Sequence, residues 1–324
     1  MVGLSSAEPR NSLIALTGAT GFIGGRIARH LLHCGWRVRL LVRPGSESRL
    51  PADVSSPRDS ESVELCTGSM ADSSALEHLL EGAEGVVHCA GLVRGLTQAD
   101  FDAVNVAGTE TLARMAAAQV KPPRFVLISS LAAREPDLSP YALSKHRAEK
   151  AVAQFGDALP WLALRPPAVY GPGDRELLPL LVAMTKGVAP ILGASTARFS
   201  LLFVDDLARA VAQAIRGGER GIFELHDGKE QGYDWEEVIA VAEAFRGGAA
   251  LRVPVPEWLL RMLARLAAGG ARLSGRPPML SPAKVNELRH PDWVCDNSAI
   301  CRVLDWHPEI QFATGLRLTL AGQI

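Results

Sequence analysis

The stretch Leu-Ile-Ala-Leu-Thr-Gly-Ala-Thr-Gly-Phe-Ile-Gly-Gly-Arg, residues 13–26, decides the fold of this chain. Its first four residues are apolar and too few for a helix, so they predict a buried strand. Three glycines follow at Gly18, Gly21 and Gly24, and helical spacing begins after them. Gly18 allows a turn with positive φ, Gly21 lets the backbone approach a pyrophosphate, and Gly24 lets the helix pack against the strand. The stretch predicts strand, tight turn and helix, with free N–H groups facing the phosphates of a dinucleotide.

A glycine-rich turn also occurs in α/β proteins that bind no nucleotide, and by itself this turn leaves that alternative open. The segment Thr-Gly-Ala-Thr-Gly-Phe-Ile-Gly resembles the start of the extended short-chain dehydrogenase/reductase family, within the NAD-dependent epimerase/dehydratase superfamily. The resemblance implies a Rossmann-type doubly wound parallel sheet, with a smaller C-terminal substrate-binding domain. It also implies that the turn contacts the cofactor through Gly18, Thr20, Gly21, Phe22, Ile23 and Gly24.

The bulk composition is that of a folded globular protein. The chain has 324 residues, of which 48% are hydrophobic and 21% charged, and a formal net charge of −1. This charge implies no surface for polyanions, so we expect no nucleic-acid partner. The length predicts one large domain with a smaller partner.

The cysteines and the N-terminus indicate a cytoplasmic protein. The five cysteines are odd in number and form no Cys-x-x-Cys pair, so we expect them to pack as small hydrophobes in a reducing compartment. Residues 1–11 contain no apolar signal core, and no stretch reaches the ~20 apolar residues of a membrane span. No metal-ligand spacing is present in the sequence, and we expect no metal.

Two loops after expected strands bear on the cofactor. Arg43 follows the strand at residues 37–42, a position beside the adenosine ribose in this fold, where a carboxylate suits NAD and an arginine a 2′-phosphate. Arg43 therefore favours NADP over NAD; the alternative is a solvated arginine. The strand at residues 63–66 leads to Ser69 and Met70, which the resemblance places at the adenine, although relatives often have aspartate where Ser69 stands.

The expected strand at residues 85–89 ends in His-Cys-Ala-Gly, similar to the family segment whose small residues pass under the cofactor. Ala90 and Gly91 are the small residues here. We interpret His88 as a hydrogen-bonded strand histidine rather than an acid–base group. The following Asn-Val-Ala-Gly-Thr resembles a family signature, by which Asn105 holds this turn and a proton-relay water; a purely structural role for Asn105 stays open.

The strongest chemical signal follows the strand expected at residues 124–129. Ser129 and Ser130 stand at its carboxyl end, where doubly wound sheets bind ligands. Tyr141 and Lys145 come next, four residues apart on a predicted helix and therefore on one face. Chance rarely places these groups after a nucleotide turn in this order.

These side chains are suited to moving a proton. A free tyrosine has a pKa of about 10, and a nearby ammonium together with an oxidised nicotinamide would lower it. Tyr141 would then exchange a proton with a substrate oxygen, while Lys145 holds the nicotinamide ribose and Ser130 fixes the oxygen. We assign the catalytic serine to Ser130 because relatives use the last serine of this segment.

The resemblance continues to the end of the chain. Residues 165–173, Arg-Pro-Pro-Ala-Val-Tyr-Gly-Pro-Gly, match a family segment in which Pro167 contacts the cofactor. Asp205 and Asp206 match a Val-Asp-Asp segment whose aspartates cap a helix and tie the two domains together. We expect a cofactor domain at residues 1–165 with about 197–226, and a substrate domain at residues 166–196 and 227–324.

Two positions indicate the substrate. Nucleotide-sugar enzymes of the family carry an asparagine where Ala168 stands, and an arginine where Phe199 stands with Arg198 one place off. The segment around Ala168 looks more like the 3β-hydroxysteroid dehydrogenase and dihydroflavonol reductase branch, which takes apolar alcohols and ketones.

A basic amphipathic helix is predicted at residues 256–268. Trp258, Leu259, Met262, Leu263 and Leu266 oppose Arg261 and Arg265. We expect the apolar side chains to pack against the small domain, while contact with a membrane surface or an apolar pocket stays open.

The sequence thus predicts an NADP-dependent oxidoreductase that transfers hydride between the nicotinamide and a secondary alcohol or ketone of an apolar, steroid-, flavonoid- or lipid-like substrate. The alternatives are a nucleotide-sugar epimerase or dehydratase that retains NAD(P), and a non-catalytic assembly or sensor protein. Dimerisation through the helices after the fourth and fifth strands is common in the family.

Overall fold

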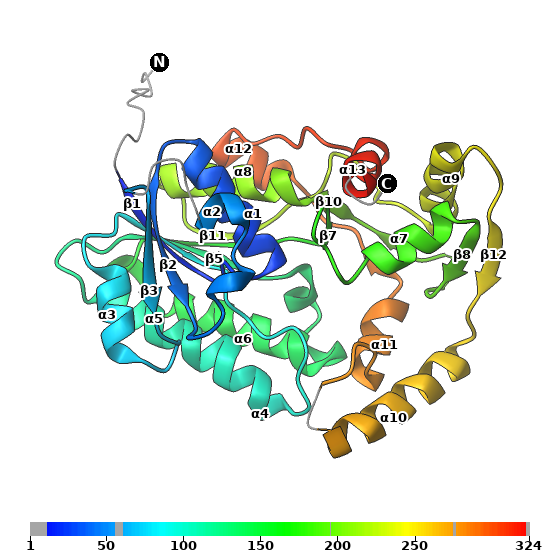
Figure 1. Ribbon diagram of the computed structural model, residues 1–324, viewed down its shortest axis with the longest axis horizontal. Helices are drawn as coiled ribbons and strands as arrows, with labels where there is room; N and C mark the ends of the chain where they lie inside the picture. Colours follow the sequence, from blue (N-terminus) through cyan, green and yellow to red (C-terminus); the bar gives the residue numbers. More distant parts are fainter. Residues whose placement is uncertain (1–11, 56–60, 195, 275–276, 322–324) are drawn as a thin grey trace.

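Seven parallel strands form the central sheet of the computed structural model, which describes residues 12–55, 61–194, 196–274 and 277–321. Residues 1–11, for which the sequence predicts no signal core, lie outside the described residues. The strand order is β11-β6-β5-β4-β1-β2-β3, so the order reverses between β1 and β4 (Figure 1). The strands are β1 Leu13–Thr17, β2 Arg37–Val42, β3 Val63–Thr67, β4 Gly85–His88, β5 Arg124–Ile128, β6 Trp161–Arg165 and β11 Gly221–Glu224.

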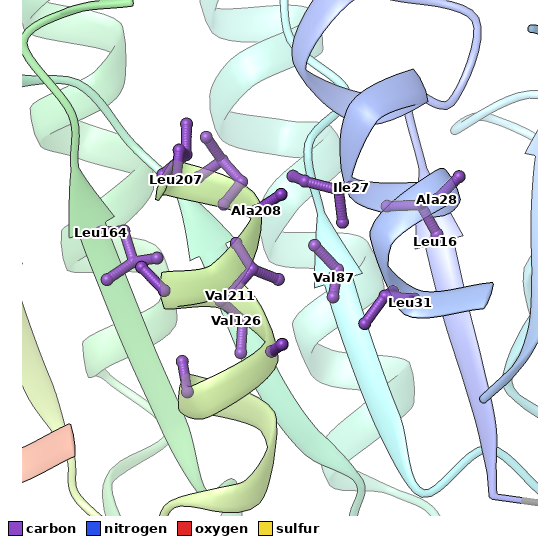
Figure 2. Packing of buried hydrophobic residues seen from close by; sticks show 14 of the residues in the cluster. Leu16, Ile27, Ala28, Leu31, Val87, Val126, Leu164, Leu207, Ala208 and Val211 are labelled. Carbon is purple, nitrogen blue, oxygen red and sulfur yellow. The ribbon is translucent and has the colours of Figure 1, made fainter. Parts of the chain in front are cut away.

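Helices cover both faces of this sheet (Figure 1). One layer contains α1 Phe22–His33, α8 Val204–Arg216 and α12 Ser298–Leu304; the other contains α3 Ser73–Leu80, α5 Gly108–Ala117 and α6 Pro140–Ala153. Figure 2 shows Ile27 and Leu31 of α1 and Leu207 and Val211 of α8 packed over the strands. The expected Rossmann-type doubly wound fold is confirmed.

Short helices connect these elements. They are α2 Ala52–Ser55, α4 Gln98–Phe101, a π-helix at Asp102–Ala107 and 3-10 helices at Glu47–Arg49, Leu131–Arg134, Pro136–Leu138 and Gly156–Ala158. The π-helix contains Asn105, and π-helical turns are frequent at functional sites.

The remaining, smaller elements pack around two further hydrophobic clusters, a large one that includes Tyr170 and a small one that includes Leu260. The helices are α7 Leu178–Thr185, α9 Trp235–Arg246, α10 Glu257–Ser274, α11 Pro282–Arg289 and α13 Phe312–Leu320. The strand pairs are β7 Ala168–Tyr170 with β10 Leu201–Phe203, β8 Val188–Ile191 with β12 Leu251–Pro254, and β9 Arg198–Phe199 with β13 Asp292–Trp293. Tyr170 packs edge-on against Phe203 and Phe312 in the large cluster. The exact domain boundaries stay a prediction.

Asp205 and Asp206 connect segments that are distant in sequence. Helix α8 begins at Val204 with Phe203 as its N-cap residue, so both aspartates lie in its first turn and the expectation that they cap it is wrong. Asp206 is fully buried and its Oδ2 accepts the backbone N–H of Ile310 at 3.0 Å. Asp205 forms an ion pair with Arg26 of α1 at 2.9 Å.

Helix α10 packs through only one narrow stripe. Leu260 and Ala264 are buried with Val285 of α11, whereas Trp258 and Leu266 are 66% and 67% exposed. The expectation that the predicted apolar face packs against the small domain is therefore wrong for Trp258, Met262, Leu263 and Leu266, whereas Leu259 is half-buried. No helix in the described ranges has the length and hydropathy to cross a membrane.

Candidate active site

The glycine turn between β1 and α1 has no room for side chains at two of its three glycines. A Cβ at Gly18, whose φ is +83°, would lie 2.7 Å from the carbonyl carbon of Cys89. A Cβ at Gly24 would lie 2.1 Å from the Gly18 oxygen, whereas one at Gly21 would meet nothing closer than 3.3 Å. The absence of side chains at Gly18 and Gly24 thus lets β1, β4 and α1 pack closely. At Gly21 it leaves the backbone open to a ligand.

The amino end of α1 fits a phosphate group. Its N-cap residue, Gly21, has no side chain to cap the first turn, and that turn holds no acidic residue. The N–H groups and the positive end of the helix dipole are therefore available to an anion. The turn opens into a cavity of about 1750 Å³.

Most of the expected cofactor residues line this cavity. Besides Tyr141 and Lys145 they are Gly18, Thr20, Gly21, Phe22, Ile23, Gly24, Gly91 and Pro167. Arg43, Ser69, Met70 and Ala90 are not among its lining residues.

Arg43 is exposed beyond the end of β2. Ser48 and Arg49, from the loop that follows it, line the cavity instead. Sequence reasoning missed both residues, because a basic residue in a loop carries no local signal of what it faces.

His88 lies in the sheet interior with both ring nitrogens hydrogen-bonded. Thr17 Oγ1 is 2.8 Å from Nδ1 and Thr109 Oγ1 is 3.0 Å from Nε2. Burial, with a smaller contribution from the Lys145 charge, lowers the pKa of His88 to about 3. The residue is a neutral strand histidine, as the sequence predicts.

Asn105 fixes the loop after β4. Its Oδ1 accepts the Leu92 N–H at 2.6 Å and its Nδ2 donates to the Leu92 carbonyl at 3.0 Å. Nδ2 also lies 2.8 Å from the Ser144 hydroxyl on α6. The side chain therefore joins the loop that carries Gly91 to the helix that carries Tyr141 and Lys145.

The two serines after β5 have different surroundings. Ser129 is 4% exposed and its hydroxyl donates to the buried carboxylate of Glu149, which also binds Arg165 through two hydrogen bonds of 2.8 and 2.7 Å. Ser130 is half-buried at the cavity, where its Oγ accepts the Ala132 N–H at 3.2 Å. Both serines line the cavity, but the Ser129 hydroxyl is engaged by Glu149, whereas the Ser130 side chain is half-buried.

Sequence reasoning missed Glu149 in this arrangement. It follows Lys145 by four residues on α6, so the same helical spacing that paired Tyr141 with Lys145 could have indicated it.

Tyr141 and Lys145 both line the cavity. Burial raises the pKa of Tyr141 to about 12, although a polar interaction with the Ser130 hydroxyl lowers it in part. Lys145 Nζ donates to the Ile128 carbonyl at 2.9 Å, and burial lowers the pKa of this ammonium. The expectation that Lys145 and an oxidised nicotinamide together lower the Tyr141 pKa concerns the cofactor-bound site and stays a prediction.

A second carboxylate reaches the site from far along the chain. Glu287 of α11 is 7% exposed, accepts from the Ser139 hydroxyl and forms an ion pair with Lys284 at 2.7 Å. Ser139 caps the amino end of α6 by accepting the Ala142 N–H at 3.0 Å. The Glu287 charge adds to the rise in the Tyr141 pKa. Nothing local in the sequence indicates this long-range contact.

We expect the tyrosines to resist ionisation in the folded protein. The chain has three, and burial raises the pKa of Tyr141 to about 12 and those of Tyr170 and Tyr233 as well. Phenolate absorbance should therefore be absent below about pH 11 and appear near about pH 10 once the chain is unfolded in urea. Since the folded pKa values exceed the unfolded value, their contribution to stability is complete below about pH 10 and is lost as the pH rises above it. Tyrosinate absorbance of the native protein at about pH 10 would contradict this prediction.

The cavity has an apolar part. Ala168 and Phe199 line it at the two positions where nucleotide-sugar enzymes were expected to carry polar anchors. Arg198 lies outside the lining and binds the Gln231 carbonyl at 2.7 Å and Glu237 at 3.2 Å. Phe199 instead packs on Trp235 with 5.3 Å between ring centroids.

The sequence model of the NAD dependent epimerase/dehydratase family matches residues 14–225. The chain belongs to this family. It is an NAD(P)-dependent enzyme of the extended short-chain dehydrogenase/reductase type. In the described residues, no group of three or more His, Cys, Asp or Glu side chains could hold a metal ion.

Known relatives span both branches that the sequence left open. A ceramide reductase of Caulobacter vibrioides is 37% identical over 290 residues, which cover 89% of this chain and 87% of the relative. A UDP-glucose 4-epimerase of Vibrio cholerae is 26% identical over 78% of this chain and 81% of its own length. The solved UDP-glucuronic acid 4-epimerase of Bacillus cereus in complex with NAD has a TM-score of 0.73 at 20% identity, with coverage of 95% and 97%. The structural likeness supports the fold.

Proposed function

We propose that the protein is an NADP-dependent reductase that acts on a ketone of an apolar, lipid-like substrate. The observation that carries this proposal is that the apolar Ala168 and Phe199 line the cavity at the two anchor positions, whereas Arg198 is bound elsewhere. A nucleotide diphosphate would find no counter-charge at either position. The ceramide reductase of Caulobacter vibrioides, whose name states a lipid substrate, supports the same class.

The residues around the cavity have separate roles in this proposal. NADPH held at the glycine turn supplies the hydride. The Tyr141 phenol, which is protonated at neutral pH, donates a proton to the substrate oxygen as the carbonyl becomes an alcohol. Ser130 donates a hydrogen bond to the same oxygen, and Lys145 orients the nicotinamide ribose. Asn105 keeps the loop under the cofactor in place through Leu92.

We expect Ser130 and Ser129 to respond differently to alanine. Ser130→Ala should lower kcat about a hundredfold, because it removes a donor to the reacting oxygen. Ser129→Ala should retain kcat and instead lower the free energy of unfolding by about 1–3 kcal/mol, since Glu149 loses a buried partner. Steady-state kinetics and urea unfolding of both variants test this. A larger kcat loss in Ser129→Ala would move the catalytic assignment to that residue.

We propose that Arg43 and Arg49 bind the 2′-phosphate of NADP. Arg49 lines the cavity, and Arg43 follows β2 on the same loop. Replacing both with alanine should raise the KM for NADPH about a hundredfold or more, because each charged hydrogen bond contributes about 1.5–3 kcal/mol. The KM for NADH should change little. An equal rise in the KM values for NADPH and NADH would show that these arginines do not bind the 2′-phosphate.

The proposed function is tested by following NADPH and NADH oxidation with steroid, flavonoid, long-chain and 3-oxo-lipid ketones, and with UDP-sugars in parallel. Net oxidation with an apolar ketone, faster with NADPH, is expected. Conversion of a UDP-sugar without net oxidation would favour the epimerase or dehydratase alternative, for which Arg175 at the cavity offers an exposed cation. No turnover of either class would favour the non-catalytic alternative. A homodimer and a cytoplasmic location stay predictions.

A further inference from the structure

Helix α10 carries a continuous apolar face that no described element covers. Trp258, Met262 and Leu266 follow one another at intervals of four residues and are 66%, 43% and 67% exposed. Leu263, 45% exposed, widens this face. The buried Leu260 and Ala264 lie on the opposite side of the helix. The four exposed residues 258, 262, 263 and 266 are called the α10 face below. Contiguous large apolar side chains on a protein surface mark interaction sites.

The charge beside the α10 face is positive. Among the described side chains of α10, Arg261 and Arg265 are basic and Glu257 is the one carboxylate. That carboxylate is occupied by Arg261 at 2.7 Å and by Arg289 at 3.1 Å. Arg265, next to the α10 face, is exposed and has no ion pair among the described residues. A helix with large apolar side chains on one face and arginines beside them is suited to an anionic lipid surface.

The cavity reaches the other side of α10, near the carboxyl end of this helix. Ala268, two residues beyond Leu266, lines the cavity together with Met279 and Leu280 of the segment that follows α10. Met279 is also 53% exposed, so it faces both the cavity and the outside. Figure 1 shows α10 at the edge of the molecule with α11 on its inner side. Met279, five residues after the end of α10, therefore connects the cavity with the outside beside this helix.

We propose that the α10 face docks the protein on the surface of an anionic phospholipid membrane. Trp258, Met262, Leu263 and Leu266 enter the interface between head groups and acyl chains, and Arg265 contacts the phosphates. The proposed docking surface is argued from the exposure and charge of α10 alone. Entry of a substrate from the membrane past Met279 rests on the proposed function.

Vesicle flotation of the full chain tests the docking surface. The probes are vesicles of phosphatidylcholine alone and of phosphatidylcholine with phosphatidylglycerol in equal parts. We expect binding to the anionic vesicles, with a blue shift of tryptophan emission that Trp258→Phe removes. The double variant Trp258→Ser with Leu266→Ser should reduce the fraction of protein bound to vesicles about tenfold, because it removes the two most exposed side chains of the α10 face. Arg265→Glu should reduce binding to the anionic vesicles at low salt.

The matched control is Val120→Ser with Leu318→Ser, two exposed apolar residues outside α10 that are 107% and 45% exposed. This variant should bind vesicles like the unmodified protein. Unchanged melting temperatures, and unchanged reduction of a water-soluble ketone without vesicles, would show that every variant is folded and that the chemistry is separate from docking. Failure of the unmodified protein to float, or equal flotation of the two double variants, would overturn the proposal. A dimer lost only in Trp258→Ser with Leu266→Ser, without vesicle binding, would assign the α10 face to a second copy of the chain.

Discussion

Tyr141→Phe should reduce kcat for ketone reduction about a thousandfold, because it removes the only atom of the side chain that can give a proton to the substrate oxygen. The ring itself remains, and with it the edge-on contact with Phe101 at 6.3 Å between centroids. The Kd for NADPH should therefore change less than about threefold, since the glycine turn and not the phenol holds the phosphates. Stopped-flow measurement of a single turnover and fluorescence titration of the cofactor give the two quantities separately.

The outcome separates the proposed reaction from its alternatives. A large loss of kcat with retained cofactor affinity supports Tyr141 as the proton donor. Because phenylalanine has no ionisable group, a change of pH should not restore the kcat of the variant. Near-normal turnover would show that Tyr141 is not the proton donor. Glu287 of α11, whose charge acts on the phenol, would then be the next candidate. Glu287→Gln, which retains the shape of the side chain, is the control for that outcome.

The parts of the site that the sequence predicts well are those encoded over short distances. The glycine turn is a run of fourteen residues, and Tyr141 and Lys145 are separated by one helical turn. The central strands likewise follow from local apolar runs and turn signals. The structure places these groups around one cavity because parallel strands bring their carboxyl ends to the same edge of the sheet.

The parts that the sequence does not predict depend on contacts across the chain. Glu287 reaches Ser139 over 148 residues, and Arg198 turns to Glu237 rather than to the cavity. The periodicity of α10 shows which side chains share a face, but the choice of the face that is buried depends on the position of α11. The pKa of Tyr141 depends on how deeply the fold buries the phenol, and spacing from Lys145 does not report this.

Gly24→Ala is expected to be among the most destabilising single substitutions in the chain, although it adds one methyl group. The new Cβ would lie 2.1 Å from the Gly18 oxygen and 2.6 Å from the Gly18 carbonyl carbon, and both are backbone atoms of the turn. Helix α1 would have to move away from β1. Overpacking of this kind costs about 3 kcal/mol or more in the free energy of unfolding.

The cofactor should be lost in the same variant, because the displaced amino end of α1 no longer presents its N–H groups at the turn. The matched control is Gly269→Ala in α10, where a Cβ meets nothing within 4 Å. There the same substitution should raise the free energy of unfolding by about 0.5–1 kcal/mol, since alanine favours the helix. Urea unfolding with and without NADPH measures both quantities: NADPH should stabilise Gly269→Ala as it does the unmodified protein, and should leave Gly24→Ala unchanged. Equal free energies of unfolding for the two variants would show that α1 can move away from β1 without cost. Gly24 would then not be needed for close packing of the helix on the strand.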